Sequence, residues 1–201
     1  MKSPLIPTLT LLAFLAAGCG TFPRPLQVSE GGRLLLDGKP FAGTLIRGVP
    51  FYKQKREYCG PASLAMVLNF WGGKFSQDDI APEVYSPTVH GSLTLDVENF
   101  ARKRGFWTRS YRGNLNDLKA HLDRGHPLIV FENRGFNVLP LDHYSVIIGY
   151  GDEQGGVVMH SAEDENLFMS YPLFLRNWEK GGFWTLLILP PAAARREELQ
   201  R

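Results

Sequence analysis

The sequence predicts an α+β domain in which an N-terminal helical half packs on a C-terminal antiparallel sheet. Between residues 59 and 127, apolar residues recur at helical steps of three and four. After Pro127 they form short β-branched and aromatic runs that turn residues separate. Helices followed by strands are typical of this class, and a chain of 201 residues is long enough for one such domain with a core.

Three further segments frame the expected domain. Residues 26–48 hold Gly-rich turns around the run RLLLDG, which predicts a short strand or hairpin before the domain. The domain itself is expected over residues 49–190. Residues 191–201 are expected to be a frayed or helical tail.

Four helices and four strands are expected inside the domain. The first helix begins at CGPASLAMVLNFWGG, where Leu64, Val67 and Leu68 predict one buried face. Pro61 suits its first turn, and Gly72 ends it. The other expected helices are residues 76–82, begun by a Ser76 cap and broken by Pro82, residues 94–105 and residues 114–127. The expected strands are residues 128–132, 143–150, 156–161 and 182–189.

The chain begins with the layout of a secretory signal. Lys2 precedes an apolar run over residues 9–17 that is too short to span a membrane, and small residues precede Cys19. The stretch LAAGC resembles the bacterial lipobox, in which the cysteine becomes the lipidated first residue. We therefore expect a signal peptide over residues 1–18, a lipid on Cys19 and a tether over residues 19–25.

This beginning also predicts a location. Gly20 after the cysteine is similar to the sorting pattern of outer-membrane lipoproteins, so we expect a lipid anchor in the bacterial cell envelope, facing the periplasm. Lipidation uses Cys19, which leaves Cys59 as a free thiol without a disulfide partner. Loss of residues 1–18 takes Lys2 from the 22 basic side chains and leaves 21 against 20 acidic ones, so nucleic acid is not an expected partner.

Cys59 combines a thiol with the start of a helix. The positive end of the helix macrodipole favours the thiolate, which is the nucleophilic form. A cysteine nucleophile also needs a base, a group that orients the base, and donors for an oxyanion. Five histidines are available as the base: His90, His121, His126, His143 and His160.

His143 is the best placed of these histidines. It begins the apolar strand HYSVIIGYG, where an imidazole can face a cleft while the rest of the strand packs inside. His160 ends the next strand across a hairpin and can lie near it, whereas His121 and His126 are expected at the surface. The residues alone leave two interpretations open: a Cys59–His143 catalytic pair, or a buried thiol and a strand-end histidine.

Two stretches carry a resemblance to a known family. VPFYKQKREYCGPASLAMVLNFWG, followed by HYSVIIGYG, resembles the bacteriocin-processing family of papain-like cysteine peptidases, which cut export leaders after a Gly-Gly pair. The similarity extends over about residues 49–189 and is closest to a standalone, secreted or lipid-anchored bacterial branch. It implies a papain-like peptidase fold for the domain.

The resemblance also implies roles for single residues. Cys59 resembles the nucleophile that forms a thioester, and His143 the general base that later protonates the leaving amine. Gln54 resembles the side-chain donor of the oxyanion hole, with the backbone N–H of Cys59 as the second donor. Gln54 precedes the cysteine by five residues, where the family spacing is six.

The third catalytic position departs from the family pattern. Where the family has Asp-Pro, this sequence reads VMHSAEDE, so Ser161 takes the place of the aspartate. A serine hydroxyl can orient an imidazole, but it does not stabilise imidazolium as a carboxylate does. The third role stays open between Ser161, His160, Asp164 and no residue at all.

The expected function is therefore an envelope-anchored cysteine peptidase, a monomer without a cofactor, whose partners are a peptide or protein substrate and the membrane. Two alternatives stay open. One is a papain-like hydrolase of cell-wall peptides in which His160 completes the triad. The other, which Ser161 favours, is a degenerate peptidase that binds a peptide without cutting it. Zinc at His143, His160 and Cys59 is not expected, because no close-spaced ligand pair frames it.

Overall fold

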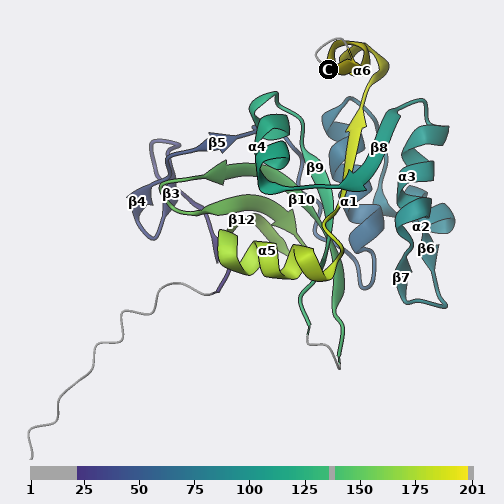
Figure 1. Ribbon diagram of the computed structural model, residues 1–201, viewed down its shortest axis with the longest axis horizontal. Helices are drawn as coiled ribbons and strands as arrows, with labels where there is room; N and C mark the ends of the chain where they lie inside the picture. Colours follow the sequence, from purple (N-terminus) through teal and green to yellow (C-terminus); the bar gives the residue numbers. More distant parts are fainter. Residues whose placement is uncertain (1–21, 136–138, 199–201) are drawn as a thin grey trace, which may run out of the picture.

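The computed structural model describes residues 22–135 and 139–198, and it confirms the predicted α+β class (Figure 1). The strands of its central sheet are β1 (Arg24–Pro25), β5 (Thr44–Leu45), β8 (Trp107–Arg112), β9 (Leu128–Asn133), β10 (Asp142–Gly151), β11 (Gly156–Ser161), β12 (Asp164–Ser170) and β13 (Trp184–Leu189). Their order is β1-β12-β11-β10-β9-β13-β8, with β5 paired on β10, and neighbouring strands run antiparallel.

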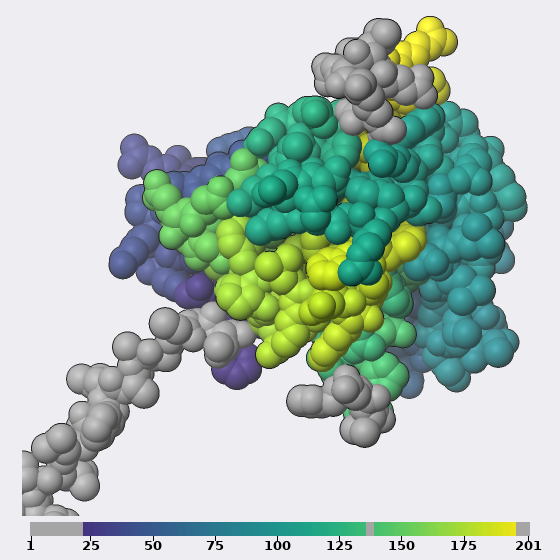
Figure 2. Space-filling view, viewed as in Figure 1, coloured from purple at the N-terminus to yellow at the C-terminus, as the bar shows by residue number. Residues whose placement is uncertain are grey.

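Helices pack around this sheet, and two small sheets are separate from it. The helices are α1 (Cys59–Phe70), α2 (Gln77–Val84), α3 (Thr94–Lys103), α4 (Leu115–Asp123), α5 (Tyr171–Lys180) and α6 (Pro191–Glu198). The small sheets join β2 (Gln27–Val28), β3 (Leu34–Leu36) and β4 (Lys39–Pro40), and β6 (Tyr85–Ser86) with β7 (Gly91–Ser92). Figures 1 and 2 place the small β2–β4 sheet at the opposite side of the molecule from α2 and α3.

The helix α1 is the centre of the core. Residues 60–68 are all buried, and the side chains of Leu64, Val67 and Leu68 are fully so. The helix packs against β10 on one side and against α2 and α3 on the other. A helix with partners on all sides is buried all round. The prediction of a single buried face was therefore wrong for α1.

The two faces of β10 have different neighbours. The ring of Tyr144 packs on Phe131 with 4.9 Å between centroids, and its hydroxyl donates to the carbonyl of Ser92 at 3.0 Å, beside the start of α1. Successive side chains of a strand point to opposite faces. Ser145 and His143 therefore share the other face of β10.

Several elements differ from those predicted. Residues 107–112, expected in the helical half, form β8 and pair with β13. The strand β12 and the helix α5 were not predicted from the sequence. The helix α2 continues through Pro82 to Val84; the proline lacks the N–H that would bond the carbonyl of Asp78, and only two helical residues follow it.

The N-terminal segment joins the sheet early. Arg24 pairs with Phe168 of β12, so the described end of the expected tether is already a strand. Residues 26–48 hold β2 to β5. The expected signal peptide over residues 1–18 and the expected lipidation site Cys19 lie outside the described residues. In the part of the chain that the structure describes, no helix has both the length and the apolar character to cross a membrane.

Removing part of the α1 core should destabilise the whole domain. We expect Leu68→Ala to lower the free energy of unfolding by about 3 kcal/mol, because its side chain is fully buried and leaves a cavity. Leu95→Ala on α3 is the matched control: this leucine is 62% exposed, and its truncation should change stability by less than about 0.5 kcal/mol. Urea unfolding followed by circular dichroism measures both. Equal losses in the two variants would contradict the burial of α1.

Candidate active site

The thiol of Cys59 lies at the N-terminal end of α1, against β10. The backbone N–H groups of Tyr144, Gly60 and Cys59 itself face its sulfur and favour the thiolate. Burial nevertheless raises the pKa of the Cys59 thiol above its ordinary value of 9.0, because desolvation of the thiolate outweighs these donors. The resting side chain is thus the protonated thiol at neutral pH, not the thiolate that the helix position predicted.

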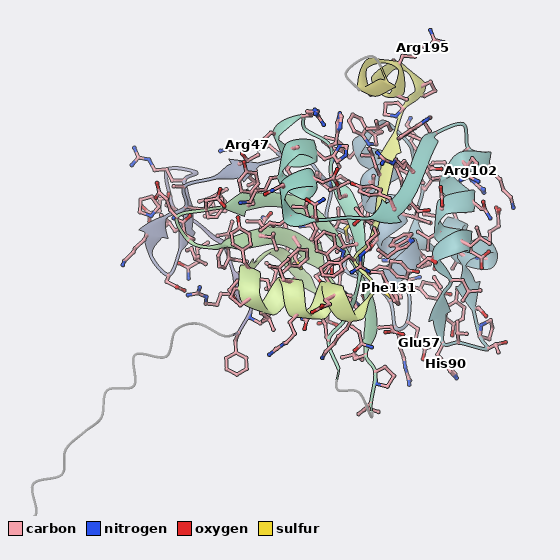
Figure 3. All side chains as sticks on the ribbon, in the orientation of Figure 1. Arg47, Glu57, His90, Arg102, Phe131 and Arg195 are labelled. Carbon is pink, nitrogen blue, oxygen red and sulfur yellow. The ribbon has the colours of Figure 1, made fainter. Side chains whose placement is uncertain are left out.

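A pocket of about 310 Å³ opens beside this thiol. Its walls come from the β6–β7 hairpin, the start of α3 and the facing ends of β9 and β10, and its lining includes Cys59, His90, Ser92, Phe131, Asp142 and Tyr144. Figure 3 labels Phe131 and His90 at the lower right of the molecule. A Cβ on Gly60 would lie 2.5 Å from the Ser92 hydroxyl, so glycine after the cysteine is what lets β7 pack on the helix start.

His90 is a pocket residue to which the sequence assigned no role. Its Nδ1 lies 3.7 Å from the carboxylate of Glu57, which also accepts the hydroxyl of Tyr85 at 2.5 Å. The hydrogen bond from Tyr85, more than the nearby His90, lowers the pKa of Glu57. Glu57 lies two residues before Cys59 along the chain, so the cluster is next to the thiol. A single histidine in a loop gave no sequence signal that it lies in this pocket.

His143 lies on the opposite face of β10 from Tyr144, with only 8% of its surface exposed. Its Nε2 is 2.9 Å from the hydroxyl oxygen of Ser161, and the structure shows no hydrogen bond between the ring and the Cys59 thiol. The thiol instead contacts the amide that links His143 to Tyr144. Burial, and secondarily the charge of Arg134, lowers the pKa of His143 to about 3.

A polar network that the sequence did not predict lies behind His143. The Ser161 hydroxyl is 2.9 Å from that of Ser145, which donates to Glu132 at 2.6 Å. Arg134 Nη2 donates to Ser161 at 2.6 Å and to Glu132 Oε1 at 2.7 Å. Glu132 is fully buried and pairs with His143 across β9 and β10. Two serine hydroxyls therefore connect the imidazole to a buried carboxylate, although Ser161 replaces the aspartate.

Gln54 is held at the end of β11. Its backbone N–H donates to the carbonyl of Ala162 at 3.1 Å, directly after Ser161. The side chain is half-buried and makes no hydrogen bond to any described residue, and it is not part of the pocket lining. The structure thus places Gln54 beside the strand of the third position while leaving its amide free of a protein partner.

His160, an alternative third residue, has other partners. Its Nε2 is 3.1 Å from the carbonyl of Val49, and its Nδ1 accepts the backbone N–H of Asn166 at 3.2 Å. Both ring nitrogens are therefore engaged, and the ring packs on Phe51 with 5.5 Å between centroids. His160 ties β11 to the segment that leads to α1. It does not approach His143, which lies on the other face.

The remaining candidates are also away from the thiol. Asp164 is exposed at the start of β12, opposite Ser161 in the register of β11 and β12. His121 and His126 were expected at the surface, but they are 2% and 9% exposed and pack against each other with 5.8 Å between ring centroids. Within residues 22–135 and 139–198, no three His, Cys, Asp or Glu side chains gather closely enough to hold a metal ion.

Comparisons with known proteins agree with this fold. A family model described as the Peptidase_C39 like family matches residues 46–185. The peptidase domain of Streptococcus ComA, a bi-functional ABC transporter, is 24% identical with a TM-score of 0.60, over 71% of this chain and 99% of that domain. A double glycine motif protease from an AMS/PCAT transporter, solved with its leader peptide, is 22% identical with a TM-score of 0.56, over 74% and 99%. No curated protein matches the chain.

The buried imidazole should make stability depend on pH. The unfolded chain binds a proton at His143 below about pH 6.5, whereas the folded chain keeps the ring neutral down to about pH 3. Stability should therefore fall as pH decreases through this window, by about 1.4 kcal/mol per pH unit from this residue. In His143→Gln that contribution should vanish. Urea unfolding of both proteins between pH 7 and pH 4 measures the difference, and parallel curves would contradict the buried neutral ring.

Proposed function

The chain belongs to the Peptidase_C39 like family, and on that premise we propose that it is a cysteine peptidase in which Cys59 and His143 hydrolyse a peptide bond through a thioester. The observation that carries the proposal is the pocket that Cys59 and Tyr144 line together. The thiol thus lies beside the residue that follows the imidazole in the chain.

The proposed reaction begins from a neutral pair. When a peptide occupies the pocket, the Cys59 sulfur attacks the scissile carbonyl carbon while Nδ1 of His143 takes the thiol proton. This nitrogen is the candidate base because Nε2 is engaged with Ser161. The proton then passes to the amide nitrogen as the C–N bond breaks, which releases the amine and leaves a thioester. Water attacks the thioester, His143 accepts its proton, and the C–S bond breaks as the thiol is reprotonated.

Gln54 is the proposed side-chain donor for the oxyanion, beside the backbone N–H of Cys59. Its position is supported by the hydrogen bond from its backbone to Ala162, which anchors a loop that is one residue shorter than the family spacing. Among residues 22–135 and 139–198 its side-chain amide has no hydrogen-bond partner, so it is available to a substrate oxygen. Donors fixed in advance stabilise the charge that develops on the carbonyl oxygen.

The substrate class and the location belong to the same proposal. A pocket with Phe131, Tyr144 and polar groups at its rim suits a peptide, and the AMS/PCAT protease with a similar fold was solved with its leader peptide. The lipobox-like stretch before Cys19 supports a lipid-anchored bacterial lipoprotein in the cell envelope, at the outer membrane and facing the periplasm. The proposed enzyme acts there as a monomer.

Peptide binding without cleavage is the second candidate. It is favoured by the raised pKa of Cys59 and by the lack of a hydrogen bond between this thiol and His143. Hydrolysis of cell-wall peptides with His160 as the third residue has less support, since both nitrogens of that ring are engaged elsewhere.

Thiol reactivity and peptide cleavage together test the proposal. We expect iodoacetamide to label Cys59 slowly at pH 7, with a rate that rises beyond about pH 9, because burial disfavours the thiolate. His143→Ala should leave labelling almost unchanged while it lowers the cleavage rate of peptides that contain Gly-Gly by at least about a thousandfold. Mass spectrometry measures labelling and cleavage on the same samples.

The outcomes separate the candidates. Labelling without any cleavage of a broad peptide pool, even with saturable peptide binding, would favour the binding module over the peptidase. Fast labelling at pH 7 that His143→Ala abolishes would instead mean a resting thiolate–imidazolium pair, which contradicts the neutral pair. Cys59→Ser is the control for cleavage by a contaminating protease.

The oxyanion role of Gln54 predicts a specific kinetic defect. Gln54→Ala should lower kcat by about a hundredfold to a thousandfold with little change in KM, because the lost hydrogen bond forms only as charge develops. Lys53→Ala is the neighbouring control, since the exposed side chain of Lys53 forms an ion pair with Glu163 at the surface. Cleavage kinetics on one peptide measure both variants. Equal kcat values in Gln54→Ala and the parent would remove Gln54 from the mechanism.

A further inference from the structure

The carboxylate missing from the third catalytic position is present one strand away. Glu132 on β9 is fully buried and stands opposite His143 in the register of β9 and β10. Its Oε1 accepts the hydroxyl of Ser145 at 2.6 Å, and Ser145 is 2.9 Å from Ser161. Ser161 in turn is 2.9 Å from Nε2 of His143. An unbroken chain of hydrogen bonds thus connects the imidazole to a buried carboxylate.

We propose that Glu132 sets the tautomer of His143 through Ser145 and Ser161, and so leaves Nδ1 free to take the proton of Cys59. This inference rests on the proposed peptidase function for its catalytic consequence. The position of the proton on the His143 ring, however, can be measured whether or not the protein cleaves peptides. Glu132 and Ser145 are positioning residues in this scheme, because neither touches the thiol or the pocket.

The directions of the hydrogen bonds follow from the carboxylate end. Glu132 forms an ion pair with Arg134 and can only accept, so Ser145 must donate its single hydroxyl proton to it. Ser145 also accepts from Arg134 Nη2 at 3.1 Å and has no proton left, so Ser161 is the donor in the bond between the two serines. With that proton used, Ser161 can only accept from His143, whose Nε2 must carry the hydrogen. In this arrangement Glu132 selects the Nε2–H tautomer of the neutral His143 ring, through the hydroxyl groups of Ser145 and Ser161.

The guanidinium of Arg134 allows the Glu132 carboxylate to be buried. It also makes this site differ from one in which an aspartate bonds the imidazole directly. Its Nη2 bonds both Ser161 at 2.6 Å and Glu132 at 2.7 Å, which compensates the buried negative charge. Arg134 also opposes a positive charge on His143. The chain of serines consequently orients the imidazole and fixes its proton without stabilising imidazolium.

The first test removes the middle of the chain and keeps the ion pair. In Ser145→Ala, the proton of Ser161 loses its acceptor and should turn to Nε2 of His143, which moves the ring proton to Nδ1. Nitrogen-15 NMR of the imidazole in the full chain, held in detergent, distinguishes the two tautomers, and His143→Gln identifies the signal. The expected result is the Nε2–H form in the parent and the Nδ1–H form in Ser145→Ala.

A matched control excludes a general effect of losing a buried hydroxyl. Thr185→Val removes another fully buried hydroxyl of the same sheet, whose partner is the carbonyl of Phe183, and it should leave the parent tautomer in place. An Nδ1–H parent, or a Ser145→Ala ring that keeps Nε2–H, would overturn the proposal. This measurement needs no substrate, so its result is independent of whether the chain cleaves peptides.

The second test first removes the carboxylate and then returns it at position 161, so that the double variant has the net charge of the parent. Glu132→Gln leaves Arg134 unpaired beside His143 and should lower kcat by about tenfold to a hundredfold with KM little changed. The double variant Glu132→Gln with Ser161→Asp returns a carboxylate to Arg134 and places it directly on Nε2. It should restore kcat to at least the parent value and raise the lower pKa of the pH–rate profile. A double variant no faster than Glu132→Gln would overturn the proposal.

Discussion

The alternation of side chains along β10 is the constraint on which the whole site depends. His143 points to one face, where it meets Ser161, while Tyr144 points to the other and lines the pocket. The amide between these two residues contacts the Cys59 thiol. A shift of one residue in register would exchange the two faces. Packing of α1 on one face and the polar network on the other both oppose such a shift.

Burial then decides the charge state of the site. It raises the pKa of Cys59 and lowers that of His143, so both side chains are neutral at pH 7. The same exclusion of water strengthens the hydrogen bonds behind the ring and makes a broken one costly. Glu132 and Arg134 compensate each other in this interior. The result is an imidazole whose hydrogen bonds to the network behind it are formed before substrate arrives, and a thiol that keeps its proton until then.

Local patterns predicted the parts of the protein that local interactions encode. The helix start at Cys59 and the strand start at His143 lie where the sequence indicated. The link to Glu132 depends on the register of two strands, which no local pattern specifies, so it was missed. His160 was expected near His143 but lies on the other face with partners from distant segments. Residues 107–112 form a strand through backbone pairing with β13, which is distant in the sequence.

A crystal structure of the chain with a peptide aldehyde ending in glycyl-glycinal would test the central claim most directly. The account predicts a covalent bond from the aldehyde carbon to the sulfur of Cys59. The new oxygen should accept hydrogen bonds from the Gln54 side chain and the Cys59 backbone, with Nδ1 of His143 close to the sulfur and Nε2 still on Ser161. An aldehyde that occupies the pocket without bonding to the sulfur, or an imidazole that stays out of reach of the adduct, would contradict it.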